Sequence, residues 1–191
     1  MRKRTWWLVR HGESVANAEG WLAGGSVDAA LTPVGVAQAE ALAASFRALP
    51  IAFVVSSTLS RARITARLAT GREPDIAHPG LRERELGSWE RATKEGLKAD
   101  GRWDTLLAWS EGPPGGESQM AVSRRVIAAL AEIDHALPPG NVAVFSHGTA
   151  LRCALGVLDD VDRANIGHSL LGNTEFAVRE LPIGAWHGVR N

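Results

Sequence analysis

Cysteine is nearly absent from this chain of 191 residues, since Cys153 is the only one. A single cysteine excludes an internal disulfide, and a reducing cytoplasm fits this composition. An excess of charge is absent too, with 21 Lys and Arg residues against 21 Asp and Glu residues. Balanced charge gives no support to binding of nucleic acid or of an anionic membrane through a bulk field. Any anion site is therefore expected to be a local cluster of arginines.

Long apolar runs are also missing. The basic start, MRKRTWWLVRHG, has an apolar run of only four residues before Arg10 interrupts it. A signal peptide needs roughly 7–15 apolar residues in that place, and a membrane span needs roughly 18–20. The sequence has no repeats or low-complexity tracts, and its 45% apolar and 22% charged residues are ordinary for a globular protein. We expect a soluble, cytoplasmic, single-domain protein.

What the sequence does contain is an alternation of short apolar runs and helical patterns. The runs predict buried strands over residues 5–10, 51–57 and 141–148. Thr32 and Pro33 are typical of a helix start, and further helices are predicted over residues 60–69, 120–137 and 149–158. The tail predicts an antiparallel hairpin of residues 173–181 and 185–190 at the sheet edge.

Strands that alternate with helices indicate an α/β fold with a mostly parallel central sheet and helices on both faces. Residues 80–118 are less regular and rich in Gly, Trp and charge. We interpret them as a small cap inserted beside the carboxyl edge of the sheet.

Two of the predicted strands end in the same kind of sequence, VRHG at residues 9–12 and FSHG at residues 145–148. In open α/β sheets, ligands bind beyond the carboxyl ends of the strands. The exit of a third strand leads to Arg61 at the same edge. Arg10, His11, Arg61 and His147 are therefore expected to converge.

Two arginines and two histidines in one site repel one another unless an anion lies among them. The planar guanidinium group suits phosphate or carboxylate oxygens, and amides at a helix start can add further donors. A dianionic phosphoryl group is the expected occupant. No metal or other cofactor is expected, because the two histidines have no carboxylate or thiolate at ligand spacing.

Six motifs, in order along nearly the whole chain, resemble the phosphatase branch of the histidine phosphatase superfamily, the phosphoglycerate-mutase-like group. They are LVRHGES with AN after it (8–14, 16–17), LTPVGVAQA (31–39), SSTLSRARITA (56–66), LRERELGSWE (81–90), PPGGES (113–118) and FSHGTALR (145–152). The resemblance implies one histidine-phosphatase domain over residues 1–191, with the cap insertion around 80–118. It also implies hydrolysis of a small phosphorylated metabolite without a metal.

The resemblance implies a role for each matching residue. His11 resembles the nucleophile that becomes a phosphohistidine, and Glu83 occupies the position of the general acid and base. Glu85 and Glu90 are rivals to Glu83 by type only. The residues expected to bind the phosphoryl group or the rest of the substrate are Arg10, Asn17, Arg61, His147, Gly148 and Trp21.

Two departures from the family pattern concern the substrate rather than the reaction. Trp21 stands where a basic residue is common, and WERA at residues 89–92 replaces the usual Trp-Glu-Gly, which places Arg91 at the cap. A less polar rim with Trp21, Trp89 and Trp103 favours a bulky or partly apolar leaving group.

Two other functions stay open at this point. One is a phosphoglycerate mutase, in which Arg91, Lys94 and Arg102 are the candidate ligands of a substrate carboxylate. The other is a non-catalytic phosphate binder, although a binder has no need of Glu83. The expected partner is a small phosphorylated substrate rather than nucleic acid or a membrane, and a homodimer through an exposed sheet edge is a further hypothesis.

Overall fold

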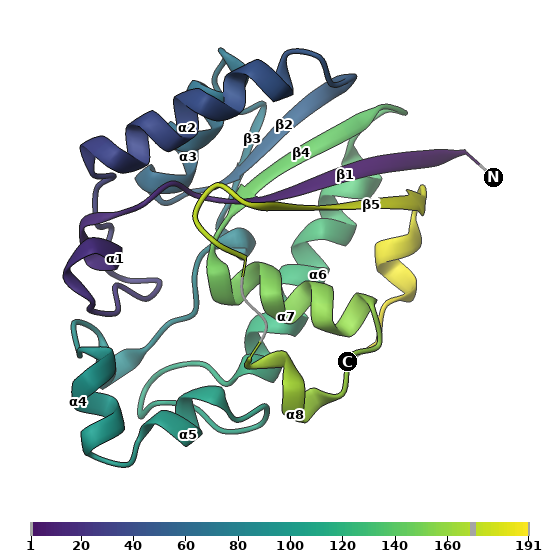
Figure 1. The fold of residues 1–191 in the computed structure, drawn as a ribbon. Helices are drawn as coiled ribbons and strands as arrows, with labels where there is room; N and C mark the ends of the chain where they lie inside the picture. The colour runs from purple at the N-terminus through teal and green to yellow at the C-terminus, as the bar shows by residue number, and fades with distance from the viewer. Residues whose placement is uncertain (1, 169–170, 191) are drawn as a thin grey trace.

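The structure is a computed structural model that describes residues 2–168 and 171–190 (Figure 1). Residues 1 and 191, the expected limits of the single domain, lie outside the described residues. A five-stranded sheet in the order β3-β2-β4-β1-β5 forms its centre. Its strands are β1 (Lys3–Arg10), β2 (Ile51–Ser57), β3 (Ile76–His78), β4 (Asn141–Ser146) and β5 (Phe176–Pro182).

The strand pairing confirms the predicted fold class. The pairs β1–β4, β2–β4 and β2–β3 are parallel, whereas β5 pairs antiparallel with β1 at one edge. The carboxyl ends of four strands therefore point to one side of the sheet. That side is where α1 lies in Figure 1.

Helices cover both faces of the sheet, as predicted (Figure 1). On β1, Trp7 and Val9 pack in a cluster with the helices of one face, whereas Trp6 and Leu8 pack in the cluster of the other face. Because both faces are buried, the strand is a continuous apolar run rather than an alternating one. The long helices are α2 (Pro33–Phe46) and α3 (Ser60–Thr70) on the first face, and α6 (Gln119–Ala136) and α7 (Gly148–Leu158) on the second.

Short elements make up the rest. The segment expected to be a cap contains two short helices, α4 (Lys94–Ala99) and α5 (Trp103–Leu107), which lie away from the sheet in Figure 1. The other short helices are α1 (Val15–Glu19) and α8 (Arg163–Ile166), with 3-10 turns at Pro79–Leu81, Gly87–Trp89 and Ala185–Gly188. Within residues 2–168 and 171–190, no helix is both long and apolar enough to cross a membrane.

The expected hairpin at the C-terminus is wrong in its second half. Residues 176–182 form the predicted edge strand, but their partner is β1, and Ala185–Gly188 form a 3-10 turn instead of a strand. Gly184, at φ 88°, turns the chain back under the sheet. The turn then buries Trp186, which is 1% exposed, in the core. Burying this large indole outweighs the pairing of a short second strand.

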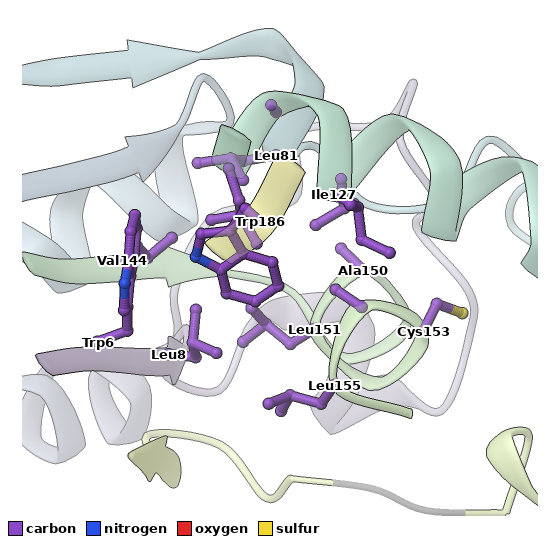
Figure 2. Packing of buried hydrophobic residues seen from close by; sticks show 14 of the residues in the cluster. Trp6, Leu8, Leu81, Ile127, Val144, Ala150, Leu151, Cys153, Leu155 and Trp186 are labelled. Carbon is purple, nitrogen blue, oxygen red and sulfur yellow. The ribbon is translucent and has the colours of Figure 1, made fainter. Parts of the chain in front are cut away.

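Trp186 packs at the centre of the larger hydrophobic cluster (Figure 2). Its ring lies edge-on to Trp6 of β1, with ring centroids 5.7 Å apart. Figure 2 shows it among side chains of β1, β4, α6 and α7, with Leu151 and Leu155 below it. The C-terminal segment is thus part of the core that supports the sheet.

A fully buried ion pair fixes the same region. Arg4 Nη1 of β1 lies 2.9 Å from Asp134 Oδ1 of α6, and both side chains are 0% exposed. Arg4 also donates to the backbone oxygens of Leu137 and Pro138, and Asp134 Oδ2 accepts from Gly184 N at 2.7 Å. Burial lowers the pKa of Arg4, and the nearby carboxylate opposes that shift.

Asp134→Ala is expected to destabilise the protein by about 3–5 kcal/mol, because it leaves the Arg4 charge buried without its counterion. Urea unfolding measures the change. Asp159→Ala, which removes an exposed pair with Arg179, is the matched control and should cost only about 0–1 kcal/mol. Equal losses in the two variants would contradict the structural role of the buried pair.

Candidate functional site

The two histidines predicted at strand ends do meet. Arg10 ends β1 and Ser146 ends β4, and these two residues are partners in the parallel register. His11 and His147 follow them directly, and their ring centroids are 5.1 Å apart in an edge-to-face arrangement. The parallel pairing of the two strands therefore brings the rings together.

His11 is held as a neutral base. It is 4% exposed, and its Nδ1 lies 2.6 Å from the carbonyl oxygen of Gly12. A proton on Nδ1 donates to that oxygen, which leaves the lone pair of Nε2 for another atom. Burial, followed by the charges of Arg61 and Arg10, lowers the pKa of His11 from 6.5 to about 3.

Gly12 is required by the approach of α2. A Cβ atom at this position would lie 2.4 Å from the carbonyl oxygen of Gly35. The Gly12 N–H donates to Thr65 Oγ1 of α3 at 3.1 Å. The backbone beside His11 is thus fixed from two helices.

His147 lies behind His11. It is 0% exposed, and its Nε2 shares a hydrogen bond of 2.8 Å with Ser57 Oγ at the end of β2. Its Nδ1 has no hydrogen-bond partner within the described part of the chain. Burial, then the charge of Arg61, lowers the pKa of His147 well below 6.5.

The two predicted arginines are held by carbonyl oxygens. Arg61, in the first turn of α3, donates from Nη1 to Val27 O and from Nη2 to Gly24 O, both at 3.0 Å. Arg10 donates from Nη1 to Leu171 O at 2.6 Å, while its buried Nε finds no partner among the described residues. Burial is the main cause that lowers the pKa of each arginine. Arg61 Nη1 also lies 3.7 Å from Asp28 Oδ1, so Arg61 has a carboxylate nearby as well as its carbonyl partners.

Glu83 lies at the start of α7. Its Oε2 accepts from Thr149 N at 3.1 Å, and its Oε1 accepts from Ala150 N at 3.1 Å and from Arg84 N at 2.9 Å. Arg125 of α6 fixes the backbone of this segment by donating to the carbonyl oxygens of Arg82 and Glu83. The carboxyl group is thus positioned by backbone donors at a helix N-terminus.

The two rival carboxylates do not reach the site. Glu85 accepts a hydrogen bond from Ser26 Oγ, and Glu90 accepts one from Ser26 N. Both side chains hold the loop that follows α1, and neither lines the cavity described below. Of the three, Glu83 alone is a cavity residue.

Asn17 lies on the rim, as predicted. It closes a capping box with Ser14, and its Oδ1 accepts from Ser14 N at 3.1 Å and from Asn173 Nδ2 at 3.2 Å. With Oδ1 occupied, Nδ2 is the group that remains for a ligand. Asn173 also donates to the carbonyl oxygen of His11 at 3.0 Å.

These residues surround one cavity of about 390 Å³. Its lining includes polar residues that the sequence analysis singled out, namely Arg10, His11, Asn17, Arg61, Glu83 and Gly148. Apolar side chains line it as well, among them Trp21, Leu22, Leu86, Trp103, Leu106 and Leu107. Trp89 is buried in a cluster with Leu86, Leu97 and Leu106 instead, and His147 reaches the site only through its contact with His11.

Sequence reasoning missed Arg152. It lines the cavity, is 8% exposed, and its Nε has no hydrogen-bond partner in residues 2–168 and 171–190. Arg152 follows Gly148 by four residues on α7, so helical spacing alone places it on the face of the helix that carries Gly148. Lys94 and Lys98 of α4 line the cavity as well.

The described residues contain no group of three or more His, Cys, Asp or Glu side chains that could hold a metal ion. The arrangement instead combines an unprotonated imidazole nitrogen, guanidinium donors and a carboxyl group around one space. Such a set can grip a tetrahedral anion, attack its central atom and move a proton.

Comparisons with known proteins agree with this geometry. The sequence model of the histidine phosphatase superfamily (branch 1) matches residues 6–190. The adenosylcobalamin/alpha-ribazole phosphatase of Salmonella typhimurium is 35% identical over 170 residues, which cover 85% of this chain and 83% of that protein. A probable phosphoglycerate mutase GpmB of an Enterobacter species is 38% identical over 160 residues, covering 80% and 73% of the two chains.

The fold is shared with solved structures of similar proteins. A mycobacterial glucosyl-3-phosphoglycerate phosphatase in complex with VO3 has a TM-score of 0.83 at 27% identity, and the match covers 92% of each chain. A phosphoserine phosphatase of Entamoeba histolytica has a TM-score of 0.80 at 27% identity, covering 92% of this chain and 89% of that one.

The neutral state of His11 predicts a dependence of stability on pH. Above pH 6.5 the imidazole is neutral in the folded and the unfolded chain alike. Between pH 6.5 and about 3, only the unfolded chain binds the proton, so stability falls as pH falls. We expect His11→Gln to reduce that loss by roughly 1 kcal/mol per pH unit between pH 6 and 4.

Urea unfolding of both proteins at pH 7, 6, 5 and 4 measures the two slopes. His135→Gln, which changes an exposed histidine of α6, is the control. Its slope of unfolding free energy against pH should equal that of the wild type. A His11→Gln slope equal to that of the wild type would show that His11 is not held neutral.

Proposed function

The chain belongs to the histidine phosphatase superfamily, branch 1, and we propose that this phosphatase hydrolyses small phosphomonoesters through a phosphohistidine formed on His11. The observation that carries the proposal is the state of His11. Its Nδ1 is tied to Gly12 O, its pKa is lowered to about 3, and it shares a cavity with the buried Arg61 and the half-buried Arg10. A neutral imidazole with Nε2 unprotonated is a competent nucleophile across the physiological pH range.

The first half-reaction transfers the phosphoryl group to the enzyme. The Nε2 lone pair attacks phosphorus, the bond from phosphorus to the ester oxygen breaks, and Glu83 gives the leaving oxygen a proton. Arg10 and Arg61 bind the equatorial oxygens, and His147 supports the nucleophile through its contact with the His11 ring. Phosphoryl transfer needs mainly such positioning and charge stabilisation.

The second half-reaction returns the enzyme to its starting state. Glu83, now a carboxylate, takes a proton from a water molecule whose oxygen attacks the phosphorus of the phosphohistidine. The N–P bond breaks, inorganic phosphate leaves, and His11 is neutral again. The backbone donors at Thr149 and Ala150 keep the carboxyl group in place for both steps. No step in this scheme uses a metal ion.

The mutase alternative receives less support. Of its three candidate carboxylate ligands, Arg91 stacks on Trp21, and Arg102 stacks on Trp89 and pairs with Asp100. Lys94 alone lines the cavity. Isomerisation of 3-phosphoglycerate at a rate comparable to ester hydrolysis would favour the mutase. The binder alternative is disfavoured by Glu83, whose position suits proton transfer to a bound ester.

Three further properties belong to the proposal. We infer one domain in which residues 80–118 act as a cap, because α4 and α5 contribute Lys98, Trp103 and Leu106 to the cavity. A cytoplasmic protein that acts on a small phosphorylated substrate, rather than on nucleic acid or a membrane, fits balanced charge and cations gathered in one cavity. A homodimer through β5, where Phe176 and Val178 are exposed, stays a prediction.

His11→Ala should abolish hydrolysis of a chromogenic aryl phosphate in EDTA, with a loss of at least roughly 10³-fold in kcat, because the covalent path is gone. Acid quenching of the wild type after a pulse of labelled ester should leave an acid-labile phosphoryl group on His11. His135→Ala keeps full activity. Undiminished turnover in His11→Ala, or loss of wild-type activity in EDTA, would refute the mechanism.

Glu83→Gln should slow alkyl phosphates by roughly 10²–10⁴-fold and aryl phosphates far less, since aryl leaving groups need little protonation. Steady-state kcat on glycerol phosphate and on 4-nitrophenyl phosphate measures the difference. Glu85→Gln is the matched control from the same segment. It should leave unchanged the ratio of kcat on glycerol phosphate to kcat on 4-nitrophenyl phosphate. Equal losses on the two substrates would remove Glu83 from the role of general acid.

A further inference from the structure

Arg91 has a backbone conformation that an arginine rarely adopts. Its φ is 67°, in the left-handed region that favours glycine and costs other residues of order 1 kcal/mol or more. Backbone hydrogen bonds between the proposed cap and the loop after α1 impose this conformation. Arg91 N donates to Leu22 O at 2.8 Å, and Leu22 N donates to Ala92 O at 2.9 Å. The strained backbone of Arg91 needs a compensating interaction.

The compensating interaction is with Trp21. The guanidinium carbon of Arg91 lies 5.4 Å from the centroid of the Trp21 ring, within the range of a cation–π contact. Trp21 Nε1 donates to Glu19 Oε2 at 2.7 Å. The indole is therefore held on its face by a cation and on its edge by a carboxylate. Trp21 and Arg91, the two departures from the family pattern, form one unit.

Trp21 lines the cavity, whereas Arg91 does not. A second indole, that of Trp103, also lines the cavity and has Lys98 Nζ 5.0 Å from its ring centroid. Leu86 and Leu106 complete an apolar surface beside the phosphoryl-binding residues. The cavity lining thus combines cationic side chains, Lys94 and Lys98 among them, with aromatic and apolar surface that a flat leaving group can contact.

We propose that Arg91 holds the Trp21 ring as a wall of the leaving-group subsite, so that the enzyme prefers phosphomonoesters with an aromatic or heteroaromatic leaving group. This inference rests on the proposed phosphatase function. Trp21 is the specificity-determining residue, because it can contact the leaving group. Arg91 is a positioning residue that acts through Trp21.

Arg91→Gly separates this role from a role in folding. Glycine suits φ 67°, so the variant should unfold at the same temperature as the wild type or above it. Its KM for 2-naphthyl phosphate should rise roughly 3- to 10-fold with kcat nearly unchanged, as expected for a lost ring contact. Its kcat/KM for glycerol phosphate, which has no ring, should stay within about twofold of the wild-type value. Arg91→Lys should restore part of the preference, since the ammonium group also binds an aromatic face.

Arg102→Ala is the matched control, because Arg102 makes the same contact, at 5.4 Å, with Trp89, which does not line the cavity. Arg102→Ala should leave unchanged the ratio of kcat/KM for 2-naphthyl phosphate to kcat/KM for glycerol phosphate. Trp21→Leu is the second variant and should lower the ratio of kcat/KM values for the two substrates as Arg91→Gly does. An unchanged ratio in Arg91→Gly or in Trp21→Leu, with the wild type active, would overturn this inference and leave the phosphatase function intact. A wild type inactive on every phosphomonoester would instead overturn the proposed function, and this inference with it.

Discussion

The site depends on keeping cationic arginines and neutral histidines together in a buried place. Arg10 and Arg61 are oriented by backbone carbonyls of Leu171, Gly24 and Val27, which accept hydrogen bonds without supplying a full negative charge. Burial is the main cause that keeps His11 neutral, and the charges of Arg61 and Arg10 act in the same direction. In the proposed mechanism the same positive charges bind a phosphoryl group and stabilise charge in its transfer. The proposed nucleophile and the proposed anion site thus depend on the same arginines.

The two ends of β1 carry arginines in different electrostatic surroundings. At its amino end, Arg4 is buried opposite Asp134, and the pair is complete within the protein. At its carboxyl end, Arg10 faces the cavity with Nε unpartnered among the described residues, and Glu83 is bound by backbone N–H groups rather than by Arg10. Arg10 is only partly buried, and the nearby carboxylates of Glu83 and Glu175 oppose the lowering of its pKa. The Arg4 pair and the core around Trp186 anchor the sheet elsewhere.

Much of this could be predicted from the sequence, for physical reasons that differ by element. The strand ends were predictable because a run buried on both faces is apolar, and polar side chains directly after it must lie at the sheet edge. Thr32 marked a helix start correctly, since its Oγ1 accepts from Gly35 N. The turn at Ala185–Gly188 was not predictable, because only the tertiary contact of Trp186 with Trp6 decides it. The three-residue strand β3 is too short to leave a periodic pattern.

The site divides in the same way. Residues that directly follow strand ends, such as His11 and His147, could be placed from the sequence, whereas Arg152 was missed because an arginine on a helix is usually a surface residue. The cap is harder still, because helices of five or six residues carry no usable periodicity.

The residues proposed for the reaction lie at the sheet, whereas those proposed for substrate specificity lie on segment 80–118 and on the loop after α1. The phosphoryl-binding residues lie on strand ends and helix starts of the sheet, where a change of backbone would disturb the core. In the proposed scheme the leaving group meets residues of segment 80–118 and of the loop after α1, and these two segments are joined by backbone and side-chain hydrogen bonds and by a cation–π contact. Substitutions at Trp21 or Arg91 can therefore change which ester is accepted without moving His11 or its arginines.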